Sequence, residues 1–312
     1  MSSGLMLVLS LLALMLGVWA LRVRRTRYRR RISREEVKRA LGACTSLIDM
    51  LAALQQHRGL STGWLAGDRG FERRMLARRR DIERLMPALM RAAELETGAI
   101  RPRFTVNDAS VFRHRWKVLV DDLGASTPEQ NIGAHTRQIE RLTAMIAALG
   151  EARIELPAAS ELPVGMARNF ACRLPALSEC LGQTRAIGSA AAAAGYCAPV
   201  ARVRLMFLVS RAESLLRQAA ELDAGQHAML ARQHVERLAR QVRTGLLDAA
   251  GTNVSADAFF ATATTAIDCI FDWIRANAEA IEKCMHSPGA ARAASNTIPV
   301  AAAGTRLATA AR

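Results

Sequence analysis

Two short segments of this chain repeat each other and set the strongest limit on its fold. LQQHRGLSTG at 54–63 and LGQTRAIGSA at 181–190 share Leu, Gln, Arg and a run of small residues, so that aligning them places Arg58 over Arg185, 127 positions apart (185 − 58). TRQIE at 136–140 matches TTAID at 264–268 with an offset of 128 (264 − 136). Two offsets that agree within one residue predict a tandem duplication of one structural unit.

The repeated unit is predicted to be helical. Apolar residues recur at 47, 48, 51 and 54 and again at 174, 177 and 181, which is helical spacing. Aromatic residues make up only 4% of the chain, which favours packed helices over a sheet. Helices are expected at about 33–65, 71–95, 106–123 and 128–150, and again at about 167–194, 199–222, 226–249 and 255–284.

These ranges predict an all-α fold of two tandem antiparallel four-helix bundles. The first bundle is assigned to residues 41–150 and the second to 167–285, with a proline-containing linker at 151–166 between them. Residues 286–312 are rich in Ala, Gly, Ser and Thr without periodicity, and we expect disorder there.

The N-terminal region predicts a membrane anchor. An apolar run at 4–21 is followed by seven arginines within 22–31, so a transmembrane helix is assigned to 1–22 and a basic juxtamembrane segment to 23–40. A cleavable signal peptide is the alternative, but its positive charge would precede the apolar run. The arginine flank then indicates a single-pass protein of the bacterial inner membrane, with most of the chain cytoplasmic and the arginines against anionic lipid.

Charge and cysteine usage exclude several other functions. The formal net charge is +15, of which the seven arginines account for +7, leaving +8 for the rest of the chain (15 − 7). The remaining basic residues alternate with acids, and no RNA- or DNA-binding signature occurs, so no nucleic acid partner is expected. The six cysteines lack zinc-site spacing, and no nucleophile, paired carboxylates or phosphate loop is found; we predict no metal, no cofactor and no enzymatic activity.

The repeat-related arginines are the candidate functional residues. On helical wheels, Arg58 lies within about 20° of Leu51 at the centre of its apolar stripe, and Arg185 about 40° from Leu181. A buried guanidinium stays charged and therefore needs an anion. Neither of these helix faces supplies a carboxylate, which leaves two interpretations open. In the first, a carboxylate from another helix pairs with each arginine, or the long stems reach solvent. In the second, the anion comes from outside the protein.

Two further arginines are candidate anion ligands, and three polar residues are candidates for supporting roles. Arg243 lies about 80° from the centre of its apolar stripe and Arg204 follows on the next helix after Arg185; ordinary flanking arginines are the alternative for both. Neutral donors are expected from the residues beside the two central arginines, namely Gln55, Thr62 and Thr184. Gln183 lies opposite Leu181 and is discounted. The small residues at 188–194 would let helices approach closely.

With these segments in view, the chain resembles the NIT domain, the nitrate- and nitrite-sensing domain of bacterial signalling proteins. The resemblance covers about 41–283 and rests on QQHRGLSTG, ECLGQTRAIGSAAAAAG with RVRLMFL, and FFATATTAIDCIF; His135 also suits the fourth helix. It implies two four-helix bundles with the anion, nitrate or nitrite, held by arginines between core helices. The family motif more often has Glu where this chain has His57.

The resemblance also shapes the expected output. No output module can be read in the sequence, so a sensor of this kind would signal by helix repacking to an unknown protein partner, through the anchor, or by forming a homodimer. The alternative function is a helical interaction scaffold, tethered to the inner membrane, that binds no anion.

Overall fold

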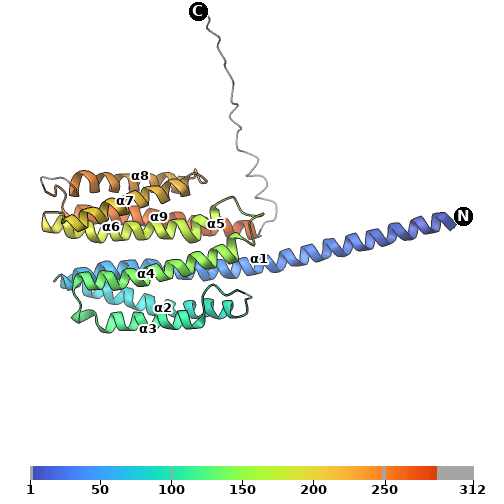
Figure 1. The fold of residues 1–312 in the computed structure, drawn as a ribbon, viewed down its shortest axis with the longest axis horizontal. Coiled ribbons are helices and arrows are strands. Elements are labelled where there is room, and N and C mark those ends of the chain that lie inside the picture. Colours follow the sequence, from blue (N-terminus) through green and yellow to red (C-terminus); the bar gives the residue numbers. More distant parts are fainter. Residues whose placement is uncertain (1–2, 100, 248–250, 287–312) are drawn as a thin grey trace, which may run out of the picture.

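The computed structural model describes residues 3–99, 101–247 and 251–286, and all regular structure within them is helical (Figure 1). The prediction of an all-α fold is therefore confirmed. The helices are α1 (Ser3–Leu65), α2 (Glu72–Thr97), α3 (Val106–Asp121), α4 (Pro128–Gly150), α5 (Met166–Arg168), α6 (Leu174–Ala194), α7 (Pro199–Ala220), α8 (Gln226–Gln241) and α9 (Ala256–His286). Short 3₁₀ or π segments join them: η1 (Arg69–Phe71), η2 (Leu123–Ala125), η3 (Glu151–Glu155), η4 (Asn169–Arg173) and η5 (Val242–Leu246).

The helices fall into two groups that lie side by side (Figure 1). In the first group α1 packs against α2 and α4, and α3 lies between α2 and α4. In the second group α6 packs against α7 and α9, and α8 lies along α9. The two groups meet where α1 contacts α6 and α9, while the N-terminal part of α1 extends beyond the packed helices. The tail predicted to be disordered lies, from residue 287 on, outside the described residues.

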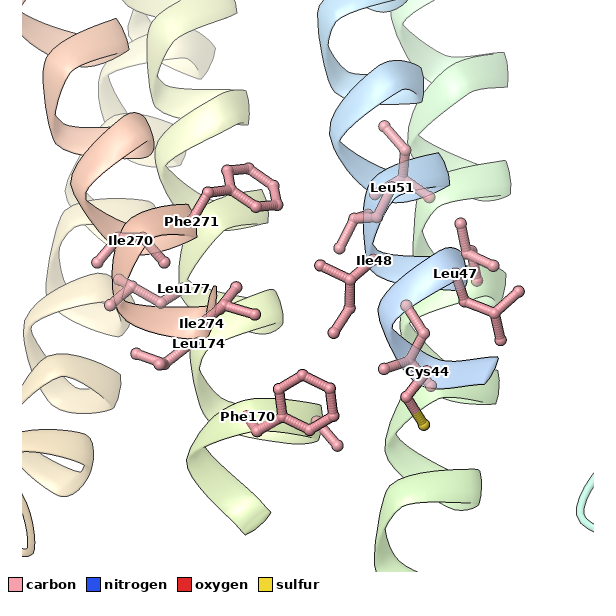
Figure 2. Packing of buried hydrophobic residues seen from close by; sticks show 14 of the residues in the cluster. Cys44, Leu47, Ile48, Leu51, Phe170, Leu174, Leu177, Ile270, Phe271 and Ile274 are labelled. Carbon is pink, nitrogen blue, oxygen red and sulfur yellow. The ribbon is translucent and has the colours of Figure 1, made fainter. Parts of the chain in front are cut away.

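A single apolar core joins the two groups. Leu47, Ile48 and Leu51 of α1 belong to the same buried cluster as Leu177 of α6 and Ile274 of α9 (Figure 2). Burying one such side chain contributes about 1.5–3 kcal/mol relative to leaving it exposed. Apolar burial therefore helps to hold the two groups together, and some polar residues at the surface between them, Arg58 and Gln55 among them, are almost fully buried.

Helix ends follow local sequence chemistry in several places. The side chain of Thr127 accepts a hydrogen bond from the backbone N–H of Gln130, whose own side chain accepts one from the backbone of Thr127, so α4 begins with a capping box at the predicted position. Elsewhere the expectation differs from the structure. Helix α1 does not begin near residue 33 but runs unbroken from Ser3, and the predicted linker contains the helical segment η3.

The predicted membrane anchor is wrong. Across the described part of the chain, no helix is both long enough and apolar enough to cross a membrane. The apolar run at 4–21 continues without a break into the arginine-rich part of the same helix. This finding overturns the transmembrane helix at 1–22 and the single-pass inner-membrane location inferred from it.

Close approach of α6 and α9 depends on a glycine. A Cβ placed on Gly188 would lie 2.2 Å from Cε1 of Phe259, a ring that is fully buried. We expect Gly188→Ala to lower the free energy of unfolding by about 1–3 kcal/mol through overpacking, measured by denaturant unfolding. Gly42→Ala is the matched control, because a Cβ on Gly42 would meet nothing within 4 Å; it should be neutral or stabilise the exposed helix by up to about 1 kcal/mol. Equal effects of the two substitutions would contradict the contact.

Candidate functional site

The two repeat-related arginines occupy equivalent, buried positions. Arg58 on α1 is 1% exposed and Arg185 on α6 is 7% exposed, which confirms that both point inward. Each donates a hydrogen bond to a threonine of the fourth helix of its own group: Nη1 of Arg58 to Oγ1 of Thr136 at 3.0 Å, and Nη1 of Arg185 to Oγ1 of Thr264 at 3.1 Å. The duplication seen in the sequence therefore extends to the hydrogen bonds of the two guanidinium groups.

A carboxylate of the second group neutralises Arg58. Nη1 and Nη2 of Arg58 donate to Oε1 and Oε2 of Glu179 at 2.6 and 3.1 Å, and both side chains are almost completely buried. Charge-assisted bidentate pairs of this kind are strong and geometrically specific. For Arg58, the interpretation in which a carboxylate from another helix pairs with the guanidinium is the correct one: Glu179 reaches it from α6, across the surface between the groups.

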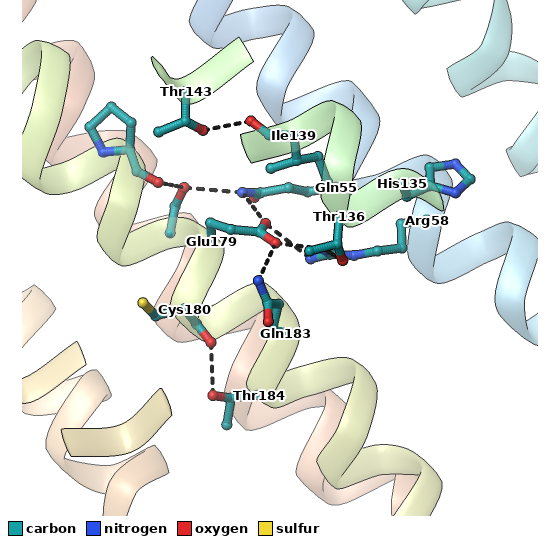
Figure 3. A network of polar contacts seen from close by, with 12 residues as sticks. Gln55, Arg58, His135, Thr136, Ile139, Thr143, Glu179, Cys180, Gln183 and Thr184 are labelled. Atoms are coloured by element: carbon teal, nitrogen blue, oxygen red, sulfur yellow. Dashed lines mark hydrogen bonds and ion pairs between the residues drawn. The ribbon is translucent and has the colours of Figure 1, made fainter. Parts of the chain in front are cut away.

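Two amides complete the set of donors around Glu179 (Figure 3). Nε2 of Gln55 donates to Oε2 at 3.2 Å, and Nε2 of Gln183 donates to Oε1 at 2.9 Å. The carboxylate therefore accepts four hydrogen bonds in a site closed to water. Gln55, expected to be a neutral donor to the anion, donates to this glutamate, and Gln183, which was discounted, donates to the same carboxylate.

Arg185 lacks such a carboxylate. Its guanidinium lies over the ring of Phe260, 5.0 Å from the centroid, and lines a cavity of about 400 Å³. Asp268 lines the same cavity, yet among the described residues no carboxylate forms an ion pair with Arg185. Burial, followed by the nearby charge of Arg58, lowers the pKa of Arg185 to about 10, so the group stays protonated at neutral pH with its charge only partly compensated.

The cavity opens between the two groups of helices and is rich in positive charge. Its lining residues come from α1, α2, α6 and α9. They include three arginines, Arg74, Arg78 and Arg185, against one acid, Asp268. Gln55, Gln56 and Thr264 add neutral polar groups to the wall. Such a lining suits a small anion, because cationic and amide donors converge on a space partly withdrawn from water.

The other predicted site residues do not join the two central arginines. Arg243 forms a bidentate ion pair with Glu213 at 2.8 and 2.7 Å on the surface, and Arg204 lies on an exposed face of α7. The hydroxyl of Thr62 donates to the carbonyl of Arg58, and that of Thr184 to the carbonyl of Cys180, so both bond within their own helices. Thr62 also accepts a hydrogen bond from Asn131.

Comparison with known proteins identifies the family. The model of the family described as nitrate and nitrite sensing, NIT, matches residues 49–277. The chain belongs to the NIT family. A solved structure of the NasR transcription antiterminator has a similar fold, with a TM-score of 0.65 and 18% sequence identity over 89% of this chain and 77% of that chain. No curated protein sequence matches the chain. The resemblance noted in the sequence is confirmed, and the family is one of sensors rather than enzymes.

A buried pair of histidines lies beside Arg58 in this NIT domain. Nδ1 of His57 lies 2.8 Å from Nε2 of His135, and Nδ1 of His135 lies 2.9 Å from the carbonyl oxygen of Asn131. Because a carbonyl can only accept, His135 carries its proton on Nδ1, and His57 then donates to Nε2 of His135. Burial is the main cause that lowers the pKa of His57 to about 4 and that of His135 well below its usual range.

Glu179 is a central residue of the site that sequence reasoning missed. It lies about 160° from Leu181 on the helical wheel, where a surface position is expected if only one face of the helix is buried. However, residues 174–182, LPALSECLG, contain no charged residue other than Glu179. A helix that is apolar or small around its whole circumference is buried on all sides, and that pattern indicates an enclosed carboxylate in need of a cation.

Proposed function

We propose that this NIT domain senses nitrate or nitrite by binding the oxyanion at the α1–α6 surface through arginines, with Arg185 as the direct ligand. The observation that carries the proposal is Arg185, a buried cation that lines a cavity and meets no carboxylate at ion-pair distance in the described part of the chain. Nitrate and nitrite are planar oxyanions, and a guanidinium offers a planar fork of donors that matches two of their oxygens. Exclusion of water strengthens each of these hydrogen bonds.

The proposed signal is a change in the packing of the two helix groups. We take these groups to be tandem antiparallel four-helix bundles, at 41–150 and 167–285, joined by residues 151–166. The anion would add hydrogen bonds between helices of both bundles, since residues of α1, α2, α6 and α9 line the cavity. The anion shifts the chain toward one packing of the helices only to the extent that it binds that packing more tightly than the other. A protein partner, or a second copy in a homodimer, would read the change.

The test is isothermal titration of the full chain with nitrate, nitrite and chloride, beside Arg185→Gln. Because a hydrogen bond to a charged group contributes about 1.5–3 kcal/mol, we expect the substitution to weaken nitrate binding at least about tenfold. Arg243→Gln is the matched control: it removes an exposed arginine that does not line the cavity and should leave binding unchanged. Circular dichroism should show the same helix content in all three proteins.

One observation supports a second candidate function, that of a helical interaction scaffold. Val200, Val203 and Phe207 share one face of α7 and are 75%, 68% and 61% exposed. Exposed apolar faces of this kind are typical of protein contact sites. The titration separates the two functions: a wild-type chain that binds none of the three anions would leave only the scaffold.

A further inference from the structure

The repeat alignment that places Arg58 over Arg185 also relates the residues around the two arginines, and these residues differ between the two halves. Glu179 precedes Arg185 by six positions on α6 (185 − 179) and binds Arg58 of α1. The residue that precedes Arg58 by six positions on α1 is Ala52 (58 − 6), and Ala52 lines the cavity beside Arg185. The same relation thus yields a carboxylate in one half of the site and a methyl group in the other.

We propose that Glu179 is a built-in oxyanion that permanently fills the Arg58 half, and that the external oxyanion binds only in the Arg185 half, in the space that Ala52 leaves. This inference rests on the proposed function and states which half takes the ligand. A carboxylate and a nitrate or nitrite ion share the planar arrangement of oxygens that a guanidinium binds bidentately. The contacts of Glu179 therefore describe, within this chain, the contacts that the ligand makes in the other half.

The guanidinium and one of the two amides that bind Glu179 have counterparts in the Arg185 half, whereas the other amide, Gln55, aligns with Gly182 (55 + 127). Gln183 precedes Arg185 by two positions and donates to Oε1 of Glu179; the residue two before Arg58 is Gln56, which lines the cavity. Thr136 holds the guanidinium of Arg58, and Thr264, also in the cavity wall, holds that of Arg185 in the same way. The ligand of the open half is thus bound by Arg185 and the amide of Gln56, while Thr264 positions the guanidinium.

The two halves also differ in access. The guanidinium of Arg58 is closed in: a Cβ on Gly182 would lie 2.8 Å from its Nη2, and Arg58 is not among the residues that line the cavity. A Cβ on Gly59 would lie 3.7 Å from Nη2 of Arg185, which is ordinary contact. The side chain of Arg185 lines an open space of about 400 Å³. Arg74 and Arg78 at the cavity wall raise the local concentration of anions. With Glu179 in place, an anion from solution therefore reaches Arg185 and not Arg58.

The decisive variant is Ala52→Glu, which supplies the missing carboxylate. We expect it to occupy the Arg185 half itself, to melt at or above the wild-type temperature without nitrate, and to bind nitrate at least about tenfold more weakly than wild type. Ala43→Glu adds the same side chain to α1 nine positions away (52 − 43), at a partly buried site outside this cavity, and should bind nitrate as wild type does. Wild-type nitrate affinity in Ala52→Glu would overturn the inference.

Glu179→Ala gives an independent test that does not depend on folding of the first variant. Removing the internal carboxylate frees Arg58, so the variant should melt at a lower temperature than wild type without anion, regain part of that loss with nitrate, and bind two nitrate ions per chain in place of one. A stoichiometry that stays at one, with no extra gain in melting temperature, would overturn the inference. A wild-type chain that binds no nitrate or nitrite would instead refute the proposed function itself, so the two failures are distinguishable.

Discussion

Replacing Arg58 by Ala is expected to lower the free energy of unfolding by about 3–5 kcal/mol. The substitution leaves the carboxylate of Glu179 buried without its cation, and breaking a buried ion pair by removing one partner typically has a cost of this size. The amides of Gln55 and Gln183 would still donate to Glu179, but they carry no charge to balance it. Urea or guanidinium unfolding monitored by circular dichroism at neutral pH measures the effect.

The surface pair of Arg243 and Glu213 provides the control for this prediction. Its two hydrogen bonds are as short as those of Arg58, yet the side chain of Arg243 is 51% exposed, and exposed pairs contribute about 0–1 kcal/mol. Arg243→Ala should therefore change stability by less than about 1 kcal/mol. The double substitution of Arg58 and Glu179 by Ala should be less destabilising than the sum of the two single ones, because their side chains interact directly. Similar losses in the free energy of unfolding for Arg58→Ala and Arg243→Ala would show that the buried pair contributes no more to stability than the exposed one.

Much of the fold could be predicted because short-range signals determine it. The repeat offset, the apolar periodicity and the Thr127–Pro128 capping box place most helices within a few residues of their observed ends. The errors arose where two local signals competed. Ser33 followed by Glu36 is a capping signal, but the residues on either side are equally able to form helix, so α1 continues through it. Pro87 likewise lies inside α2 without ending it.

The site was predictable only one helix at a time. A helical wheel relates each side chain to the core of its own helix, and on that basis Arg58 and Arg185 were correctly directed inward. It does not say which helix of the other group lies opposite. Glu179 and Gln183 lie on the far side of α6 from Leu181, and they join the site because α6 also packs against α1. That contact, with a sequence separation of more than a hundred residues, is not encoded in any local pattern.

Lowering the pH from 7 to about 4 is expected to destabilise this chain, with His57 contributing on the order of 3 kcal/mol. Burial lowers the pKa of His57 from 6.5 to about 4, and each pKa unit corresponds to about 1.4 kcal/mol. The folded chain keeps this imidazole neutral while the unfolded chain binds a proton below pH 6.5. Stability is therefore retained above pH 6.5 and lost as the pH falls toward 4. His135, whose pKa is also lowered, acts in the same direction.

His57→Gln isolates this contribution from that of the carboxylates. A glutamine amide can still donate to Nε2 of His135 but does not titrate, so the variant should lose less stability than wild type between pH 7 and 4.5 in denaturant unfolding. His114→Gln, on an exposed part of α3, controls for the loss of a histidine outside the core and should keep the wild-type pH dependence. An equally steep loss in His57→Gln would mean that the histidine pair does not stay neutral in the folded chain.

The histidine pair lies next to the site. His57 directly precedes Arg58, and His135 directly precedes Thr136, which accepts a hydrogen bond from the guanidinium of Arg58. A proton taken up there would place a second positive charge beside Arg58 and weaken the packing of α1 against α4.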